Sequence, residues 1–540
     1  MTVARYTPFE TDAVLRDDRT WLAVALVVAV LVYFVYLATH RYPAYGAGLY
    51  MQIAEQLRVH GYGLPARIPG YTARGVPFAY PPLAFYAAAA AVDLTGASAF
   101  TYSRLVPGLV IVASVVPYYF LARELLGTAP RAGFATVVFA TAPEALQWHL
   151  SAGGIVRAPA LLLALIGAWV GIQLFRAGDR RWTGPAAALF GLTILTHPVY
   201  AIFFGVTYLV LFAGYDRTAG GLVAGGLVAV GGLLLAAPWW SQVVAVHGVD
   251  VFAGAAGTHR GLGGGLARLV AVLGVEPDLS ALFYLAVFAG LAYGLVRRRY
   301  VLVAWFLACW YVVGQARFLF VVGGLLVAPL VFEGVAPAVR RRAGVGWVVP
   351  VVAAIGLVLA TTGLLYAGGA LAGPRGSAQP AFVDDDDVAA MAWVQANTPP
   401  DAQFVVLGDA AEWFPQQTDR TILVGPWGVE WTTPARYERQ LSLFRSLSGC
   451  HTESCLTAGL RTAGVAPDYV YVPTGSYTVR GASATQPPAM RRSLVASDRY
   501  DLVYENDGVA VFRTTRTAGR TRLSRRSGSR RERFPPRLRS

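Results

Sequence analysis

A chain of 540 residues of which 55% are hydrophobic and only 14% are charged, with a mean hydropathy of +0.49, is too apolar to be a water-soluble globular protein. All 45 basic side chains are arginines, the formal net charge is +14, and much of this charge lies at the ends of apolar runs and in the C-terminal tail. Such a distribution is typical of membrane topology and argues against nucleic-acid binding.

About eleven apolar runs are long enough to cross a membrane as helices. The first has no small-residue cleavage site behind it, so we expect it to stay in the protein as a helix. With residues 1–20 as a cytoplasmic segment, the predicted transmembrane part covers residues 21–367. The runs lie near residues 21–38, 105–122, 132–147, 158–175, 184–197, 199–214, 219–238, 280–296, 300–314, 318–336 and 346–367.

A further run, residues 80–94, is ambiguous, and the arginine-rich loops decide its place. If this run stays outside the membrane as a juxtamembrane helix, those loops fall on the cytoplasmic side together with the arginines near the N-terminus, as the positive-inside rule requires. We therefore predict a large first outer loop, residues 39–104, and an extracytoplasmic C-terminal part.

The C-terminal part, residues 368–513, differs in composition from the spans. A junction rich in glycine, proline and serine is followed by a possible helix near residues 388–400. Residues 514–540 nearly lack apolar side chains, so we expect a disordered, arginine-rich tail. Short runs rich in β-branched and aromatic residues predict strands at 402–409, 420–425, 468–473, 500–507 and 508–514. The predicted fold class is a polytopic α-helical membrane protein with a small C-terminal extracytoplasmic α/β domain.

Two groups of side chains in this domain are of interest. Asp409 and Glu412 beside Trp413 form an arrangement suited to sugar binding, and an ordinary turn with a core tryptophan is an equal alternative. Cys450 and Cys455 could close a small disulfide if the domain faces an oxidising compartment. A metal site that includes the histidine between them is the weaker alternative.

The first outer loop begins with a predicted amphipathic helix. Leu49, Ile53 and Leu57 share one helical face, which we expect to lie on the membrane interface. Glu55 then faces water or a cleft, and its alternative role is a surface ion pair with Arg58. Glu55 is therefore one candidate for a catalytic carboxylate.

The remainder of this loop, residues 61–86, combines prolines, glycines, tyrosines and arginines. Prolines and glycines favour a shaped loop that returns the chain to the membrane. Tyrosines beside arginines, Arg74 and Tyr80 among them, suit a sugar or a phosphate through ring stacking and charge-assisted hydrogen bonds. They equally suit the aromatic belt of any membrane protein.

Residues 61–86, 104–127 and 140–165 resemble the N-terminal half of GT-C glycosyltransferases, the polytopic enzymes that take sugars from polyprenyl-phosphate lipids. Residues 316–330 and 391–420 are similar to later segments of archaeal and bacterial members. The resemblance covers residues 20–510 loosely and consists of topology and composition more than of an invariant signature. It implies a GT-C-like membrane fold and sugar transfer outside the cytoplasmic membrane.

The resemblance also carries a departure. GT-C enzymes usually have an aspartate or glutamate just after the first span, where this sequence has Gly46, Ala47 and Gly48. Two acids nearby, Glu55 and Glu144, are candidates for the base that takes the acceptor proton. Glu144 ends the third predicted span, where an acid is unfavourable unless it is interfacial, paired or in a polar cavity. Its alternative role is therefore an interfacial ion pair.

Candidate phosphate ligands open two of the predicted spans. Arg157 and Arg317 suit a phosphate because guanidinium binds it bidentately and stays charged near the bilayer, and snorkelling to the interface is an equal alternative. His149 and His197, at outer span ends, could bind a pyrophosphate or a sugar, or a metal together with Glu144. A divalent metal is possible, and the sequence does not identify the cofactor.

The leading hypothesis is a transferase that moves a sugar from a polyprenyl-phosphate donor to an extracytoplasmic glycan, lipid or protein. The missing first-loop acid leaves a second hypothesis, a noncatalytic homologue that binds polyprenyl lipid. A transporter is less favoured, because it predicts acids or interrupted helices at mid-membrane, whereas the charges here gather at span ends. No Walker-type phosphate loop, nucleophile elbow or HExxH motif occurs in the sequence.

Overall fold

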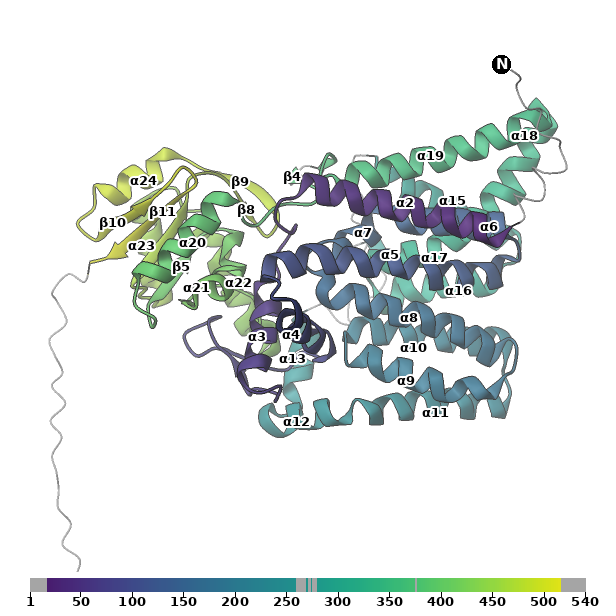
Figure 1. The fold of residues 1–540 in the computed structure, drawn as a ribbon, viewed down its shortest axis with the longest axis horizontal. Helices are drawn as coiled ribbons and strands as arrows, with labels where there is room; N and C mark the ends of the chain where they lie inside the picture. Colours follow the sequence, from purple (N-terminus) through teal and green to yellow (C-terminus); the bar gives the residue numbers. More distant parts are fainter. Residues whose placement is uncertain (1–16, 259–268, 271–272, 274–278, 374–375, 516–540) are drawn as a thin grey trace, which may run out of the picture.

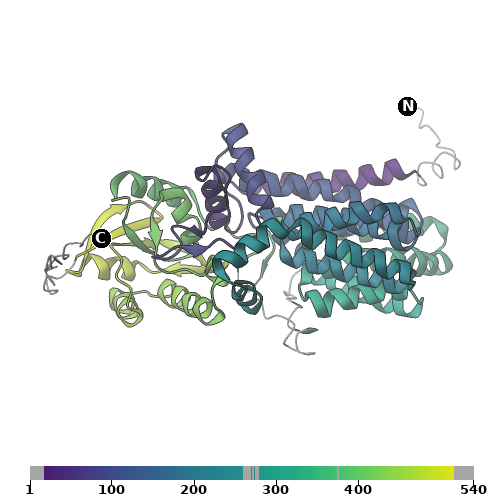
Figure 2. The same cartoon turned by 90° about the horizontal axis from the view of Figure 1, so that it is seen from below.

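The computed structural model describes residues 17–258, 269–270, 273, 279–373 and 376–515. Long helices run side by side at one end, and a smaller part made of strands and short helices lies at the other (Figures 1 and 2). The predicted N-terminal segment before residue 17 and the predicted tail beyond residue 515 lie outside the described residues.

Within the described part of the chain, six helical segments are long and apolar enough to cross a membrane. A seventh is possible if α11 (Ala219–Leu235) and α12 (Ala237–His247), which are bent by 57°, form one span. The protein is thus a multi-pass membrane protein. The six segments are α2 (Asp18–Thr39), α5 (Ala99–Leu126), α8 (Gly154–Phe175), α10 (Pro198–Tyr215), α17 (Ala316–Pro329) continued by η3 (Leu330–Val335) and α18 (Ala336–Ala343), and η4 (Val345–Trp347) continued by α19 (Val348–Ala367).

The six or seven candidate spans of the described residues do not confirm the predicted number of about eleven. Every predicted run is helical, but several helices are too short by themselves to cross. The run 132–147 is divided at Ala142, because Pro143 starts a new helix there. Hydropathy measures apolar length and does not show where a helix breaks. The shorter helices are α6 (Ala129–Thr141), α7 (Pro143–Leu150), η1 (Arg180–Trp182), α9 (Thr183–Ile194), α13 (Asp250–Thr258), α15 (Ala281–Val296), α16 (Tyr300–Ala308) and η2 (Cys309–Val313).

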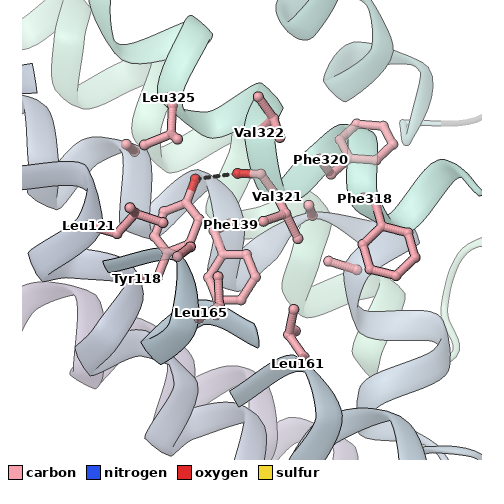
Figure 3. Close-up of a cluster of buried hydrophobic side chains, with 14 of the residues drawn as sticks. Tyr118, Leu121, Phe139, Leu161, Leu165, Phe318, Phe320, Val321, Val322 and Leu325 are labelled. Carbon is pink, nitrogen blue, oxygen red and sulfur yellow. Dashed lines mark hydrogen bonds between the residues drawn. The ribbon is translucent and has the colours of Figure 1, made fainter. Parts of the chain in front are cut away.

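A buried contact between α5, α6 and α17 lies in the core of the helical part (Figure 3). The Tyr118 hydroxyl donates a 2.7 Å hydrogen bond to the carbonyl of Val321, and its ring stacks on Phe139 with 4.3 Å between the centroids. Gly324 makes the close approach possible, since a Cβ there would lie 2.6 Å from the Tyr118 oxygen. The Tyr118 hydroxyl, a polar group within the apolar bundle, is therefore hydrogen-bonded.

Residues 39–104, predicted to be the first outer loop and called by that name below, contain α3 (Gly48–Val59), β1 (Arg67–Ile68), β2 (Val76–Pro77) and α4 (Leu83–Thr95). The predicted amphipathic helix is α3, and Leu49, Ile53 and Leu57 are buried as expected. Their environment differs from the expectation, because this face packs into a hydrophobic core shared with the C-terminal part rather than onto the membrane interface. The C-terminal part offers α3 an apolar surface that the local sequence pattern does not reveal.

The C-terminal part is built on a five-stranded sheet, in the order β10-β11-β7-β5-β6. β5 (Gln403–Val406) is parallel to both β6 (Thr421–Ile422) and β7 (Tyr469–Pro473), whereas β11 (Val509–Thr514) is antiparallel to β7 and β10 (Tyr500–Glu505). Each of the five predicted strands is present, which confirms the mixed α/β character.

The remaining elements of the C-terminal part surround this sheet and connect it to the last span (Figure 1). The helix predicted near residues 388–400 is α20, which begins three residues earlier in a capping box formed by Asp384 and Asp387. The elements are β3 (Ala372–Gly373), β4 (Gly376–Ser377), α20 (Asp385–Asn397), η5 (Asp409–Glu412), α21 (Phe414–Thr418), η6 (Val429–Trp431), α22 (Pro434–Ser448), α23 (Glu453–Ala463), β8 (Gly475–Val479), β9 (Ala482–Gln486) and α24 (Pro488–Val495).

Backbone hydrogen bonds join the first outer loop to the C-terminal part. The amide of Ile422 donates to the carbonyl of Gly70 at 2.8 Å, and the amide of Tyr45 donates to the carbonyl of Pro380 at 2.8 Å. Because backbone groups and a common core connect them, the loop and the C-terminal part pack as one unit.

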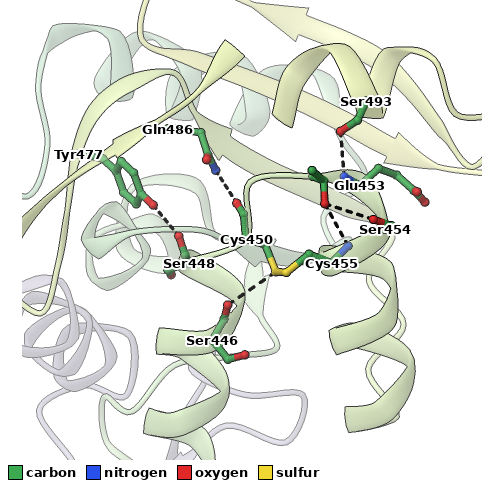
Figure 4. The surroundings of a disulfide bond; sticks show 10 residues. Ser446, Ser448, Cys450, Glu453, Ser454, Cys455, Tyr477, Gln486 and Ser493 are labelled. Atoms are coloured by element: carbon green, nitrogen blue, oxygen red, sulfur yellow. Dashed lines mark hydrogen bonds between the residues drawn. A yellow bond between two sulfur atoms is a disulfide. The ribbon is translucent and has the colours of Figure 1, made fainter. Parts of the chain in front are cut away.

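A disulfide between Cys450 and Cys455 closes the turn between α22 and α23 (Figure 4). The loop is also held by hydrogen bonds, since Gln486 donates to the carbonyl of Cys450 at 3.1 Å and the amide of Glu453 donates to Ser493 at 2.8 Å. The pairing that the sequence left open is thus present in the fold.

Replacing both disulfide cysteines by alanine should lower the free energy of unfolding by about 2 kcal/mol, because a short crosslinked loop restricts the unfolded chain. Thermal unfolding of purified protein with and without reductant measures this effect. Reductant should destabilise the native chain and leave the Cys450→Ala/Cys455→Ala variant unchanged. Equal unfolding temperatures for the oxidised and reduced native chain would contradict this expectation.

Candidate functional site

Two arginines lie at the end of the helical part that faces the C-terminal part. Arg157 is in the first turn of α8 and Arg317 is the second residue of α17. Arg317 is only 8% exposed, and the Nε atoms of both side chains have no hydrogen-bond partner. Neither guanidinium forms a salt bridge with a carboxylate of the described residues. A buried cation without a counter-ion is unfavourable, so this arrangement favours an anionic ligand.

Tyrosines surround the two guanidinium groups. Tyr50, Tyr80 and Tyr200 lie within electrostatic range of Arg157, and Arg317 lies over the Tyr200 ring with 5.4 Å to the centroid. The hydroxyls of Tyr50 and Tyr80 are 3.1 Å apart and share a hydrogen bond. Phenol hydroxyls and ring faces are suited to a phosphate oxygen and to a sugar face, respectively.

His149 is fully buried at the end of α7 and shares a hydrogen bond with the Tyr200 hydroxyl through its Nε2 atom. Burial and the nearby positive charges of Arg317 and Arg157 lower the pKa of His149 to about 3. The ring is therefore neutral at physiological pH, and it adds no further positive charge to the cluster.

His197 and Tyr80 complete the part of the predicted site that the fold brings together. His197 caps α10 by accepting a hydrogen bond from the amide of Val199 at 3.3 Å, and its ring contacts Tyr200 edge to face. Tyr80 contacts the ring of Trp431 from the C-terminal part with 4.9 Å between centroids. We call Arg157, Arg317, His149, Tyr200, Tyr50 and Tyr80 the arginine cluster.

The other predicted residues lie elsewhere or have other partners. Glu55 is half-exposed on α3 and forms a salt bridge with Arg58. This is the surface ion pair that the sequence predicted as its alternative role. Arg74 is exposed in the turn between β1 and β2. Glu144 accepts a 2.6 Å hydrogen bond from the Tyr284 hydroxyl, which is a neutral partner.

The C-terminal part contributes carboxylates to the surroundings of this cluster that the sequence did not assign to it. Glu430 in η6 lies within electrostatic range of Arg157 and Tyr80. Burial raises the pKa of Glu430 to about 7 and that of Glu412 to about 8. The tryptophans that flank Glu430 in the sequence, Trp427 and Trp431, are the one local signal for a ligand site here.

The described residues do not fit a bound metal ion. No group of three histidine, cysteine, aspartate or glutamate side chains in the described part of the chain is arranged to hold one. The arginine cluster carries two positive charges and a neutral histidine, and this composition favours an anion over a cation.

The fold is similar to that of solved GT-C membrane glycosyltransferases, as the resemblance in sequence implied. One is the Archaeoglobus fulgidus oligosaccharyltransferase, whose complex with Zn and sulfate superposes with a TM-score of 0.56 at 15% identity, covering 83% of this chain and 68% of that chain. The Archaeoglobus fulgidus oligosaccharyltransferase AglB, in complex with an inhibitory peptide and a dolichol-phosphate, gives a TM-score of 0.56 at 14% identity, covering 86% of this chain and 70% of that chain.

A second solved relative in fold is the arabinofuranosyltransferase AftD from mycobacteria. It gives a TM-score of 0.54 at 18% identity and covers 92% of this chain but 40% of that chain. No protein-family profile and no curated protein sequence matches the chain. At these identities the likeness establishes the fold, and the activity has to be argued from the site.

The raised pKa values of Glu412 and Glu430 predict that stability falls as pH rises. Their ordinary pKa is 4.5, so between about 4.5 and 8 the folded chain keeps protons that the unfolded chain has lost. The free energy of unfolding should decrease across this range and level off above it. Thermal unfolding from pH 5 to pH 9 measures the slope.

Glu412→Gln and Glu430→Gln should each make this slope shallower, because an amide does not titrate. Glu438→Gln on the exposed face of α22 is the matched control and should keep the native slope. Half-buried Asp387, whose pKa is raised to about 7 by desolvation, contributes a similar decline that all variants retain. Identical slopes in the native chain, in Glu412→Gln and in Glu430→Gln would contradict the raised pKa values of these two carboxyl groups.

Proposed function

We propose that this chain is a membrane glycosyltransferase that moves a sugar from a polyprenyl-phosphate donor to an acceptor outside the cytoplasmic membrane. The observation that carries the proposal is the pair of half-buried Arg157 and buried Arg317, neither of which forms a salt bridge with a carboxylate of the described residues. A lipid-linked phosphate supplies the missing negative charge, and its polyprenyl chain fits a site at the end of a helical bundle.

The arginine cluster matches what sugar transfer from a lipid phosphate requires. As the bond between the sugar and the phosphate breaks, negative charge accumulates on the leaving phosphate, and two fixed guanidinium groups stabilise it. The Tyr80 ring and the Trp431 ring meet beside Arg157 and provide apolar faces for a sugar. The solved AglB complex with dolichol-phosphate supports a polyprenyl lipid as the ligand class.

The proposal includes a topology. Residues 21–367 form the transmembrane part, residues 368–513 form an extracytoplasmic domain, and the N-terminus is cytoplasmic. Two arguments support this orientation: the positive-inside rule favours a cytoplasmic place for the arginine-rich loops, and a disulfide such as Cys450–Cys455 forms in an oxidising compartment. The arginine cluster then lies at the outer surface of the membrane, next to membrane lipids and the acceptor.

A second candidate function is favoured by one specific observation. The backbone after the first span carries glycines at positions 46 and 48, where the resemblance implies an acid. A noncatalytic homologue would keep the arginines and bind polyprenyl phosphate without turnover. Glu55 and Glu144, the acids proposed from the sequence, are tested by their glutamine variants in the turnover assay.

Binding of polyprenyl phosphate tests both functions. Arg157→Gln and Arg317→Gln should each weaken binding by about 10-fold to 100-fold, since each removes charge-assisted hydrogen bonds to the phosphate. Arg445→Gln, at an exposed arginine of α22, is the control and should bind as the native chain does. Purified protein in nanodiscs and a labelled short-chain polyprenyl phosphate provide the measurement.

Turnover is then measured with a panel of radiolabelled polyprenyl-phosphate sugars. Sugar release or transfer by the native chain, reduced in both arginine variants, is the expected result. Lipid binding that depends on the arginines but gives no turnover with any donor would favour the noncatalytic homologue. Absence of binding, or binding that the arginine variants leave unchanged, would overturn both functions.

A further inference from the structure

Glu412, from the C-terminal part, fills the space beside the glycines that follow the first span. A Cβ built on Gly46 would lie 2.1 Å from Glu412 Oε2 and 2.2 Å from its carboxyl carbon. A Cβ built on Gly48 would lie 2.0 Å from the Glu412 carbonyl oxygen. Any side chain at either position would displace Glu412, so the two glycines admit this carboxylate to the start of α3.

Hydrogen bonds on both sides fix this contact. The Tyr71 hydroxyl of the first outer loop donates to the Glu412 carbonyl at 2.6 Å, and Trp413 Nε1 donates to the Tyr45 carbonyl at 3.4 Å. Tyr45 immediately precedes Gly46 in the chain. The backbone at Glu412 is therefore held against the loop by hydrogen bonds that start on both partners, and this places its side chain beside Gly46.

The electrostatic surroundings connect Glu412 to the arginine cluster. Arg480 from the turn between β8 and β9, Asp409 from its own helical turn, Trp427 and Glu430 act on its charge. Glu430 is in turn within range of Arg157. Asp409 accepts hydrogen bonds from the amides of Arg480 and Gly481 at 2.8 Å and 2.7 Å, so it fixes the turn that carries Arg480.

Other acids are less suited to proton transfer at this site. Glu55 is paired with Arg58 on the surface of α3, and Glu144 is bonded to Tyr284. Glu430 is engaged by amides of its own turn, which lower its pKa against the effect of burial. Glu412 is half-buried, interacts with the Trp427 side chain and forms no salt bridge with an arginine among the described residues, so no guanidinium group occupies its oxygens.

We propose that Glu412 is the general base that takes the acceptor proton, so that the C-terminal part supplies the catalytic carboxylate to a site formed by the transmembrane part. This role rests on the proposed function. The acceptor oxygen forms a bond to the anomeric carbon while its proton passes to a Glu412 oxygen. The bond between that carbon and the phosphate oxygen breaks, and its electron pair leaves with the phosphate that Arg157 and Arg317 bind.

The first experiment measures turnover of Glu412→Gln and Glu412→Ala with a donor that the native chain uses. Loss of a general base typically lowers kcat by about 10²-fold to 10⁴-fold, and the KM for the donor should stay near the native value because the arginines are intact. Glu438→Gln is the matched control on an exposed helix. If the alanine variant does not fold, the isosteric glutamine variant still gives the answer.

A relocation of the carboxylate distinguishes catalysis from structural support. Gly46 has no positive φ, and its Cβ direction points at the Glu412 carboxylate. In Gly46→Asp/Glu412→Ala the new carboxylate therefore occupies nearly the same place. We expect at least a tenfold recovery of kcat over Glu412→Ala, by restoring part of the general-base effect, whereas Gly46→Asp alone should be impaired by the clash.

The pH profile gives an independent readout. Since burial raises the pKa of Glu412 to about 8, native kcat should rise as pH increases through about 8, and this rise should disappear in Glu412→Gln. Arg480, Asp409, Trp427 and Glu430 are the groups that face this carboxylate. The Glu430→Gln profile should keep the rise, displaced toward lower pH because a neighbouring negative charge is gone.

Each outcome of these experiments supports or overturns the role of Glu412. Native kcat in a folded Glu412→Gln protein overturns the role of Glu412 and leaves the proposed function standing. A low kcat with an unchanged pH profile and no recovery in the relocated variant assigns Glu412 to structure alone, which also overturns the proposal. A native chain without turnover on every donor removes the proposed function and this role with it.

Discussion

The positive charge of Arg157 and Arg317 is the constraint around which this end of the protein is organised. Two guanidinium groups at the end of an apolar bundle are unfavourable unless an anion joins them, because the protein offers them little solvation. The groups around them are consistent with that need: Tyr200 presents its ring to Arg317, and His149 stays neutral. The cluster is therefore stabilised by the same ligand that the proposed reaction uses.

The packing of the first outer loop against the C-terminal part brings Trp431 and Glu430 next to the arginine cluster. Ile422 and Tyr45 make backbone hydrogen bonds across the boundary, and the apolar face of α3 is buried in the common core. Because Tyr50 lies on the same helix whose first turn contacts Glu412, one rigid element orients groups on both sides. Movement of the C-terminal part relative to the bundle would separate carboxylates from arginines.

Local pattern predicted much of this architecture, and long-range packing explains the rest. The strands were predictable from β-branched runs, and the proximity of Arg157, Arg317 and His149 was predictable because residues at the same end of neighbouring helices lie near one another. The span number was not, since Pro143 divides a run that hydropathy reads as continuous. Nor was the contact of Glu412 with Gly46, because nothing within either segment specifies a partner more than 300 residues away.

Burial acts in opposite directions on the two kinds of charge in this site, and both effects favour transfer chemistry. A guanidinium keeps its charge when it is buried, since its ordinary pKa is so high, and so it remains a ligand for phosphate. A carboxyl group instead gains affinity for a proton, as the raised pKa values of Glu412 and Glu430 indicate. The same apolar boundary thus produces a strong anion site and a strong base. The glycines after the first span are consistent with arginines from the transmembrane part and a carboxylate from the C-terminal part, because they leave room for Glu412.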